Sequence, residues 1–282
     1  MSFEALLEEY EKRRAKALAG GGAEKYAKRK AAGMWNARER IDYLVDRGTW
    51  VESGLFGSSA VYPEQEDETQ TDGKLAGFAK ISGRDVCVVV NDFTVKGAST
   101  SATNSKKIAH MKRTATERGM PLVLIGESTG ARLPDAMGSR GMGLLLGHDI
   151  TQFRRMRETP MAAAAFGPSF GSSTWLMCQA DFAVMKKGAT MAVSSPRLVS
   201  MALNEKVDAE ELGGWRLHAE ITGLIDQVAD TEEEAFDSIK RFLSYLPSHH
   251  MEAPPDAPVP AGSRSEEHTS ELQSHVRISY AV

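Results

Sequence analysis

Cysteine is scarce in this 282-residue chain, which contains only Cys87 and Cys178. Both lie inside apolar segments, so we expect two buried thiols. No Cys-x-x-Cys pair is present, which excludes a zinc ribbon. Among residues 1–263 the histidines are scattered rather than clustered: His110, His148, His218 and the pair His249-His250. The sequence therefore predicts no metal site.

An excess of either charge is also missing, with 34 basic and 38 acidic residues and a formal charge of −4. This balance gives no reason to expect a nucleic acid partner. No apolar run is long enough to span a bilayer, so we expect no membrane partner. The N-terminus is acidic and mixed, unlike a secretory or transit peptide. A cytoplasmic globular protein with one large α/β domain is the expectation.

Several catalytic motifs are absent as well. No Walker-type phosphate loop is present. The spacing Gly-x-Ser-x-Gly does occur, at Gly126–Gly130 and Gly167–Gly171, each after an apolar run, so a serine nucleophile with a histidine base stays open as an alternative. The glycines of Gly138–Gly143 follow a turn rather than a strand, which argues against a dinucleotide site. The remaining candidate is chemistry performed by backbone N–H groups.

Two glycine-containing turns, each preceded by an apolar run, favour this chemistry. Pro121–Ile125 leads into Glu127–Arg132, and Met161–Phe166 leads into Gly167–Ser173. Each pattern predicts a buried strand, a tight turn and the start of a helix. Because the first N–H groups of a helix have no internal acceptors, two such turns side by side can hold a developing oxyanion. The alternative is that both are ordinary connections of an α/β domain.

The chain divides into four parts. Residues 1–32 are rich in Glu, Lys, Arg and Ala and predict an exposed helical arm, broken at Gly20–Gly22. In residues 33–246, strand, turn and helix recur about every 40 residues, which predicts a layered α/β domain. Residues 247–263 are proline-rich and predict a linker to a further domain. Residues 264–282 form a separate tail.

Within the α/β domain we expect a helix capped by Asn36 and a turn-rich loop over residues 57–73. The expected strands cover residues 74–81, 85–90, 121–125, 161–166, 182–186 and 190–193. The expected helices lie near residues 105–118, 142–157 and 232–245, with another beginning near Ser172.

The tail does not follow the pattern of the rest of the chain. Arg264–His275 resembles the translation of a short-read sequencing adapter, with Val276-Arg277 in the place of the index. We therefore expect residues 264–282 to be an artefact and leave them out of fold reasoning. On this interpretation the chain is an N-terminal fragment, and apolar surface that a missing half would cover is exposed.

Five motifs in register carry a family resemblance. They are Ala37–Ile41, Asp92–Val95 with Gly97, Ser128–Arg132, Gly167-Pro168 with Gly171, and Glu211–Gly214 with His218. Over residues 30–250 the chain resembles the N-terminal half of the carboxyltransferase (β) subunit of biotin-dependent acyl-CoA carboxylases, the propionyl-, acetyl- and methylcrotonyl-CoA group.

The resemblance implies a crotonase-like fold, a spiral of ββα units that binds an acyl-CoA. It implies carboxybiotin as the cofactor, carried by a biotin carboxylase or biotin carrier subunit rather than by this chain, and no metal. It also implies a homo-oligomer, a hexamer in the family. The implied reaction transfers the carboxyl group to the α-carbon of the acyl-CoA through an enolate, with biotin itself as the base.

The resemblance also implies site residues. The oxyanion donors are placed at the backbone of Gly130, Ala131, Gly171 and Ser172. Losing one such donor typically costs about 3–4 kcal/mol of transition-state stabilisation. Candidates for the CoA-binding residues are Arg38, Arg40, Gly97, Ala98, Ser99, Lys106, Lys107 and Arg132. For the basic residues a solvated charged face is the alternative, Arg132 could cap its own turn, and residues 97–102 could be a connector.

The chain departs from the family pattern at three places. Thr129 stands where the family often has glycine, and Phe170–Ser173 stands where it has Ala-Gly-Gly-Ala. A Cβ at Ser172 narrows the approach to the thioester oxygen, because glycine permits the closest contact. Thr222–Asp226 replaces a Ser-Gly-x-x-His pattern. These changes predict a divergent subgroup with a different acyl group.

Three functions stay in view. The first is the acyl-CoA-binding half of a carboxyltransferase. The second is an acyl-CoA decarboxylase or transcarboxylase, which would release free CO₂ from a malonyl-type thioester without ATP. The third is a non-catalytic CoA-binding module. On the truncation hypothesis, the chain alone is expected to bind CoA and to transfer little or no carboxyl group.

Overall fold

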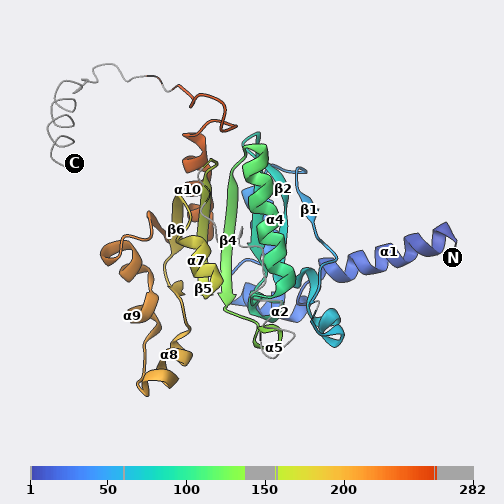
Figure 1. Ribbon diagram of the computed structural model, residues 1–282, viewed down its shortest axis with the longest axis horizontal. Coiled ribbons are helices and arrows are strands. Elements are labelled where there is room, and N and C mark those ends of the chain that lie inside the picture. The colour runs from blue at the N-terminus through green and yellow to red at the C-terminus, as the bar shows by residue number, and fades with distance from the viewer. Residues whose placement is uncertain (1, 60, 137–155, 157, 257, 259–282) are drawn as a thin grey trace.

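The computed structural model describes residues 2–59, 61–136, 156, 158–256 and 258 (Figure 1). Within them the chain forms one eight-stranded mixed sheet with the order β1-β2-β3-β4-β5-β6-β8, and β7 pairs with β5. Strands β1, β2 and β3 are antiparallel, and the remaining pairs are parallel. The strands are β1 Val51–Ser53, β2 Lys74–Ile81, β3 Arg84–Asn91, β4 Leu122–Thr129, β5 Met161–Phe170, β6 Phe182–Lys186, β7 Thr190–Ala192 and β8 Gln227–Ala229.

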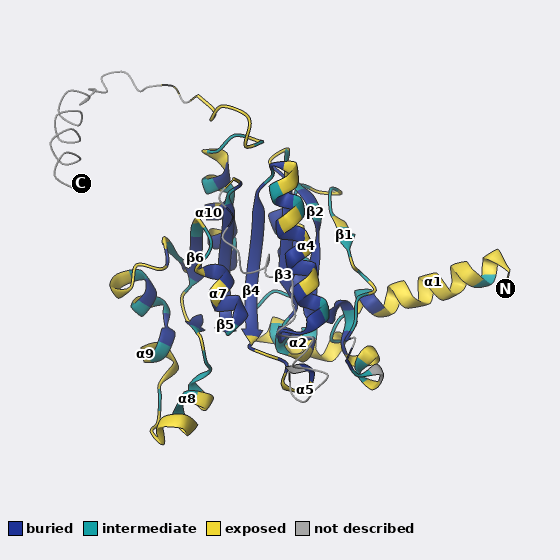
Figure 2. Ribbon diagram, viewed as in Figure 1, coloured by how far each residue is buried: buried dark blue, intermediate teal, exposed yellow. Residues whose placement is uncertain are grey.

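Helices cover both faces of this sheet and extend beyond it (Figures 1 and 2). The α-helices are α1 Phe3–Leu18, α2 Ala23–Ala31, α3 Ala37–Leu44, α4 Ala102–Arg118, α5 Leu133–Ala136, α7 Ser172–Met177, α8 Pro196–Leu203, α9 Ala209–Gly213 and α10 Glu232–Ser244. Short 3₁₀ segments occupy η1 Pro63–Glu68, η2 Gln70–Gly73 and η3 Lys96–Ala98, and a π-helical turn occupies η5 Leu217–Ile221.

The core has two layers, one on each face of the sheet, because side chains alternate along each strand. Residues at odd positions of β4, such as Val123, pack with α3 and α10 in one cluster. Residues at even positions, such as Leu124, pack with α4 and α7 in the other. At the centre, Ala162–Ala165 are fully buried. Their small side chains let helices approach the sheet closely from both sides.

The N-terminal arm forms two helices, as predicted, separated at Gly20–Gly22. Helix α1 is mostly exposed and projects from the body (Figure 2). Helix α2 is tied to the domain, because Tyr26 donates to Asp92 at 3.0 Å and Arg29 pairs with Glu127 at 2.6 Å. The arm is therefore anchored by its second helix.

A buried arginine links the two ends of the domain. Arg40 of α3 donates to Glu232 of α10 at 2.7 and 2.8 Å and to Glu127 of β4 at 3.2 Å. Burial opposes its charge, but the two carboxylates outweigh burial and raise the pKa of Arg40. The guanidinium also lies 4.8 Å from the ring centre of Phe166.

Most expected elements are present, with differences at their ends. The predicted strands at 121–125 and 161–166 were too short, because β4 continues to Thr129 and β5 to Phe170. Ser128 pairs with Ser169 and Thr129 with Phe170, and β7 adds further pairing to the end of β5. The helix near 105–118 begins earlier, because Ser101 caps it with Asn104 in a capping box.

Other expectations were wrong or fall elsewhere. The segment 57–73 is not a plain loop, since it contains η1 and η2 and buries Asp72. The expected helix over 142–157 and the tail over 264–282 lie outside the described residues, apart from Met156. The short elements β1, α8, α9, η5 and β8 were not predicted. Residues 247–256 contain no helix or strand, and the His250 N–H donates to Gly119 O at 3.1 Å.

The two thiols have different environments. Cys87 is buried, as expected, and burial raises its pKa to about 12. Cys178 is exposed, so the expectation of two buried thiols was wrong. Its position at the C-terminal cap of a short helix turns it outward although its neighbours are apolar.

We expect a disulfide-forming thiol reagent to label Cys178 rapidly in the native chain and to label Cys87 only after unfolding. Counting labelled thiols by mass spectrometry, with and without denaturant, checks this. Rapid native labelling of both thiols would contradict the packing of β3.

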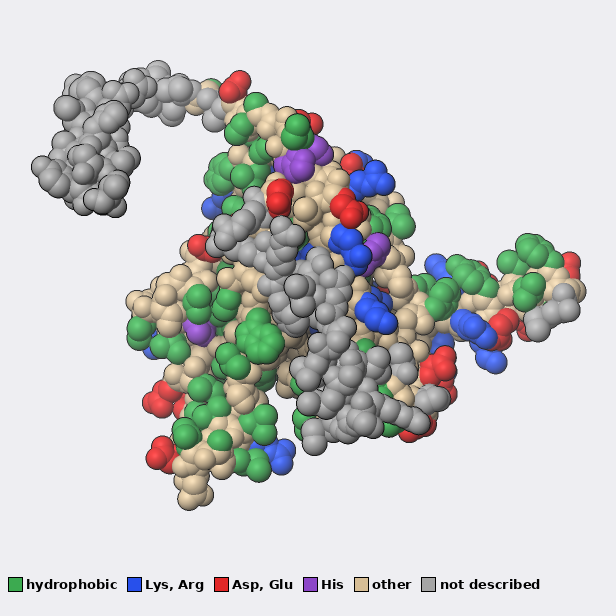
Figure 3. All heavy atoms as spheres, in the orientation of Figure 1, with side chains coloured by type: hydrophobic (Ala, Val, Ile, Leu, Met, Phe, Trp, Pro, Cys, Tyr) green, Lys and Arg blue, Asp and Glu red, His purple; other side chains and the backbone are tan. Residues whose placement is uncertain are grey.

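Exposed apolar side chains gather on the extension formed by α8 and α9 (Figure 3). Helix α8 has no buried residue, and Leu198, Met201 and Leu203 are among its exposed side chains.

No described helix is long and apolar enough to cross a bilayer.

Candidate functional site

The two predicted glycine turns meet at the carboxyl ends of β4 and β5. A Cβ added to Gly171 would lie 3.3 Å from the Cα of Gly130. Both glycines have positive φ, at 98° for Gly130 and 65° for Gly171. The parallel pairing of Thr129 with Phe170 carries the two turns to the same edge of the sheet. The structure thus brings together the four residues predicted as oxyanion donors.

Their N–H groups are not all available. The Gly130 N–H donates to its neighbour Ser128 at 3.1 Å, and the Gly171 N–H donates to Val193 O at 3.1 Å. Among the described residues, the N–H groups of Ala131 and Ser172 have no hydrogen-bond acceptor. Ser172 opens α7, where the geometry of a helix leaves such groups unpaired.

A third segment, residues 96–100, packs against the Gly130 turn. The Thr100 N–H donates to Gly130 O at 2.8 Å, and the Arg132 N–H donates to Thr100 O at 2.9 Å. A Cβ on Gly97 would lie 2.5 Å from Cγ2 of Thr129. Only glycine at position 97 therefore allows this approach.

The candidate CoA-contacting residues of this segment lie in a tight turn. The N–H groups of Ala98 and Ser99 donate to Val95 O at 2.9 Å and Lys96 O at 3.2 Å. They stabilise the turn and are not directed toward a ligand. Residues 97–99 thus shape the edge of the site.

The Ser172 side chain is held at the same place. Its hydroxyl lies 2.5 Å from the hydroxyl of Thr100. This contact links α7 to the 96–100 segment and keeps the Ser172 Cβ at the site. The serine that replaces the family glycine is therefore fixed by a partner of its own.

The predicted basic residues are in very different positions. Lys106 is exposed on α4. Arg38 is partly exposed and pairs with Glu52 at 2.9 Å. Arg40 is fully committed to Glu127 and Glu232, which does not agree with contact to a phosphate. The Lys107 ammonium donates to the carbonyls of Thr71 and Lys74, at 2.6 and 2.9 Å, and is buried too.

Arg132 is buried and is bound by other residues of the protein. It is 4 % exposed and pairs with Asp72 and Asp135, while its Nε donates to Ser99 Oγ at 3.2 Å. Burial raises the pKa of Asp135, and the Arg132 charge opposes that rise. The arginine therefore fastens its own turn to η2 and to the 96–100 segment.

Asp72 was missed by sequence reasoning, although it organises this region. It is fully buried, accepts from the Asn104 N–H at 3.1 Å and contacts Ser101 and Arg132. Nothing in the acidic 57–73 segment distinguished it from its exposed neighbours, because its partners Asn104, Ser101 and Arg132 lie far along the chain.

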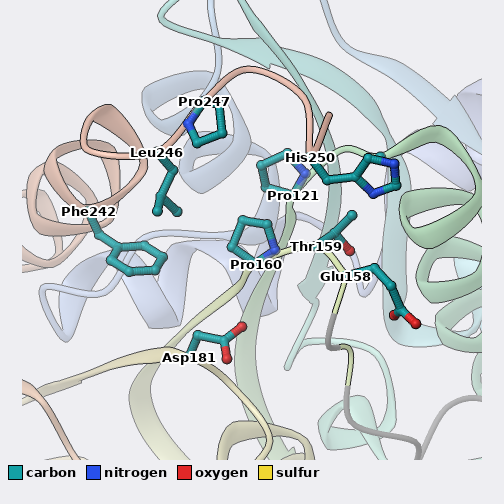
Figure 4. Close-up of a pocket in the computed structure, with 10 residues that line it drawn as sticks. Pro121, Glu158, Thr159, Pro160, Asp181, Phe242, Leu246, Pro247 and His250 are labelled. Atoms are coloured by element: carbon teal, nitrogen blue, oxygen red, sulfur yellow. The ribbon is translucent and has the colours of Figure 1, made fainter. Parts of the chain in front are cut away.

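A separate cavity of about 450 Å³ lies at the opposite end of the sheet (Figure 4). Pro121 and Pro160, which directly precede β4 and β5, contribute to its wall together with Phe242 and Leu246. It is therefore remote from the glycine turns and is not the predicted site. The described residues contain no cluster of His, Cys, Asp and Glu able to hold a metal ion.

Comparison with known proteins gives the family. Residues 28–278 match the carboxyl transferase domain. The chain belongs to the carboxyl transferase domain family. The predicted resemblance is confirmed.

Two relatives show how far this carboxyl transferase domain resembles named proteins. It is 34% identical over 262 residues to the propionyl-CoA carboxylase carboxyltransferase subunit of Haloferax mediterranei, covering 90% of the chain and 50% of that protein. It is 31% identical over 251 residues to the methylmalonyl-CoA decarboxylase subunit alpha of Veillonella parvula, covering 87% of the chain and 48% of that protein. The chain spans about half the length of the curated relatives it matches.

The fold of the domain has solved counterparts. A crystal structure of transcarboxylase 12S, described as a hexamer with hydrolysed methylmalonyl-coenzyme A bound, superposes with a TM-score of 0.80 at 30% identity. The match covers 89% of this chain and 50% of that one. The crotonase-like α/β fold predicted from the sequence is confirmed.

Proposed function

We propose that this chain forms the acyl-CoA-binding half of an enzyme that transfers a carboxyl group to or from the α-carbon of an acyl-CoA. The observation that carries the proposal is the contact between the Gly130 and Gly171 turns, beside which two N–H groups have no acceptor among the described residues. Membership of the carboxyl transferase domain family supports the same chemistry.

The proposed chemistry needs a site for negative charge. Removing a carboxyl group or a proton from the α-carbon places charge on the thioester oxygen as an enolate. In our proposal the N–H groups of Ala131 and Ser172 donate to that oxygen, and Gly130 and Gly171 permit its close approach. Preorganised donors in a water-excluded site stabilise such charge strongly.

Carboxybiotin, carried by a biotin-bearing partner, would supply the carboxyl group as CO₂, and the biotin left behind would accept the α-proton. The described residues offer the acyl-CoA side of the reaction. We propose that Lys106 and Arg38 meet the CoA phosphates, because both retain exposed surface near the start of α4 or α3. Arg40, Lys107 and Arg132 are left out of this set because of their buried partners. A homo-oligomer and a cytoplasmic location complete the proposal.

The reverse direction is a second candidate. The identity to the methylmalonyl-CoA decarboxylase subunit, 31%, is close to that with the carboxylase subunit, 34%. An oxyanion site stabilises the same enolate in both directions. Release of CO₂ from a malonyl-type thioester without ATP would assign the decarboxylase direction.

Calorimetric titration of the chain with two probes tests the proposal. One is CoA, and the other is a nitronate analogue of an acyl-CoA, whose anionic oxygen stands in for the enolate oxygen. We expect the analogue to bind at least about tenfold more tightly than CoA, because transition-state analogues gain from donors that CoA does not use.

Equal binding of the two probes would indicate a CoA-binding module without an oxyanion site. Binding of neither probe would contradict the proposal altogether. Both outcomes are readable with the chain as it stands, since neither requires turnover.

A further inference from the structure

Lys74 is a buried cation that the proposed chemistry does not use. It begins β2, and its side chain is 1 % exposed. Its Nζ donates to Asn91 Oδ1 at 3.1 Å and to the Ala98 carbonyl at 3.2 Å, both neutral acceptors. Burying an ammonium without a hydrogen-bonded carboxylate is unfavourable. The burial of this charge next to residues that contact the glycine turns therefore needs an explanation.

The Ala98 carbonyl belongs to a strained turn. Lys96, Gly97 and Ala98 have consecutive φ values of 49°, 60° and 47°. Residues other than glycine adopt this left-handed conformation only where the surroundings enforce it. Two side chains donate hydrogen bonds to the Ala98 carbonyl: Lys74 through Nζ, and Ser128 through Oγ at 3.1 Å. They hold the turn against the end of β4.

The second acceptor of Lys74 leads to the other side of the site. The Nδ2 of Asn91 donates to Glu127 O at 3.1 Å and to Ser173 Oγ at 3.3 Å. Ser173 lies in the first turn of α7, next to the proposed donor Ser172. One ammonium thus contacts the 96–98 turn directly and the start of α7 through Asn91.

We propose that Lys74 is a positioning residue of the oxyanion site, which holds the 96–98 turn against the Gly130 turn and orients the first turn of α7 through Asn91. The inference rests on the proposed function, because it assigns Lys74 to that same site. Lys74 does not touch the ligand itself.

Its charge changes near neutral pH. Burial lowers the pKa of Lys74 to about 7, with Asp72 of η2 opposing the shift and Arg132 and Lys107 adding to it. Burial lowers the pKa of Lys107 on α4 to about 8. In β4, the backbone carbonyl of Glu127 accepts a hydrogen bond from Asn91, while its carboxylate pairs with Arg29 and Arg40.

The protonation state of Lys74 determines the strength of its hydrogen bonds to Asn91 and Ala98. A charged donor makes a hydrogen bond roughly twice as strong as a neutral one. These hydrogen bonds are therefore strongest when the pH is below the pKa of Lys74, and they weaken as the pH rises through about 7.

The test compares the affinities of the nitronate analogue and CoA for the wild type and for Lys74→Met, from about pH 6 to about pH 8.5. We expect the preference of the wild type for the analogue to fall several-fold across this range. In Lys74→Met the preference falls about tenfold at the acidic end and its pH profile flattens, while CoA affinity stays within about twofold. Ionisation of the analogue itself affects all variants alike and cancels in the comparison.

Lys112→Met is the matched control. Lys112 is buried to the same degree, and burial lowers its pKa to about 8. Its Nζ donates to Gln179 at 2.7 Å, beyond the C-terminal end of α7 and away from the glycine turns. This variant should keep the wild-type preference and pH profile.

A folded Lys74→Met variant with an unchanged preference and an unchanged profile overturns the inference. Should that variant fail to fold, Lys74→Gln, which keeps a donor without the charge, is the second test. It should retain part of the preference and lose the pH dependence, and an unchanged pH dependence overturns the inference. Failure of the wild type to bind either probe contradicts the proposed function instead, so the two failures are distinguishable.

Discussion

Replacement of Arg40 by methionine is expected to lower the free energy of unfolding by about 3–5 kcal/mol. Arg40 is 1 % exposed and holds Glu232 at 2.7 Å and Glu127 at 3.2 Å. Glu127 retains Arg29 at 2.6 Å after the substitution, but the buried Glu232 loses its counter-ion. An uncompensated buried charge is far more unfavourable than the pair it came from. The loss is a large fraction of the total stability of a typical domain, about 5–15 kcal/mol.

Urea unfolding followed by tryptophan fluorescence measures this change, since Trp35 packs on Phe236 of α10. The double variant Arg40→Met/Glu232→Gln should recover part of the loss, because it removes the stranded carboxylate. Arg13→Met is the matched control, since its pair with Glu9 lies on the exposed α1 helix, and it should leave the unfolding curve unchanged. A loss below about 1 kcal/mol in Arg40→Met would show that the network is not part of the native core.

Arg40 also shows what the sequence could not predict. Its motif, Ala37–Ile41, was recognised, and the helix capped by Asn36 forms as expected. However, a charged residue on a short amphipathic helix has the same local pattern whether it faces solvent or a carboxylate far away in the chain. Its partner Glu232 is 192 residues away, and no local period reports such a contact. Asp72 escaped prediction for the same reason.

The juxtaposition of the two turns was predictable, because the carboxyl ends of neighbouring parallel strands meet at one edge. Their exact starts were not. The apolar runs end at Ile125 and Phe166, whereas pairing continues through polar residues to Thr129 and Phe170. Strand ends set by a third strand, β7, carry no signal in the run itself. The sequence therefore identified the turns but misplaced where each strand ends.

The substitution Gly171→Ala is expected to weaken binding of the nitronate analogue by about 100-fold and to leave CoA binding nearly unchanged. A Cβ at this position would lie 3.3 Å from the Cα of Gly130 and 3.9 Å from the Ala131 N. These neighbours are backbone atoms, so no side chain can move aside to make room. The positive φ of 65° adds backbone strain to an alanine at this position. The Gly130 turn must shift by a few tenths of an ångström, which moves the N–H groups of Ala131 and Ser172 apart. Calorimetric titration with both probes measures the effect.

Gly188→Ala separates strain from geometry in this experiment. Gly188 has φ of 83°, and a Cβ added there would meet no atom within 4 Å, so an alanine there also has an unfavourable positive φ but makes no close contact. Both variants should lose stability because of the positive φ, by roughly 1–3 kcal/mol each, yet only Gly171→Ala should lose the preference for the analogue. If the two variants bind the analogue equally well, the spacing of the turns does not matter. The oxyanion donors then lie elsewhere than at Ala131 and Ser172, because donors fixed at those positions cannot tolerate the separation.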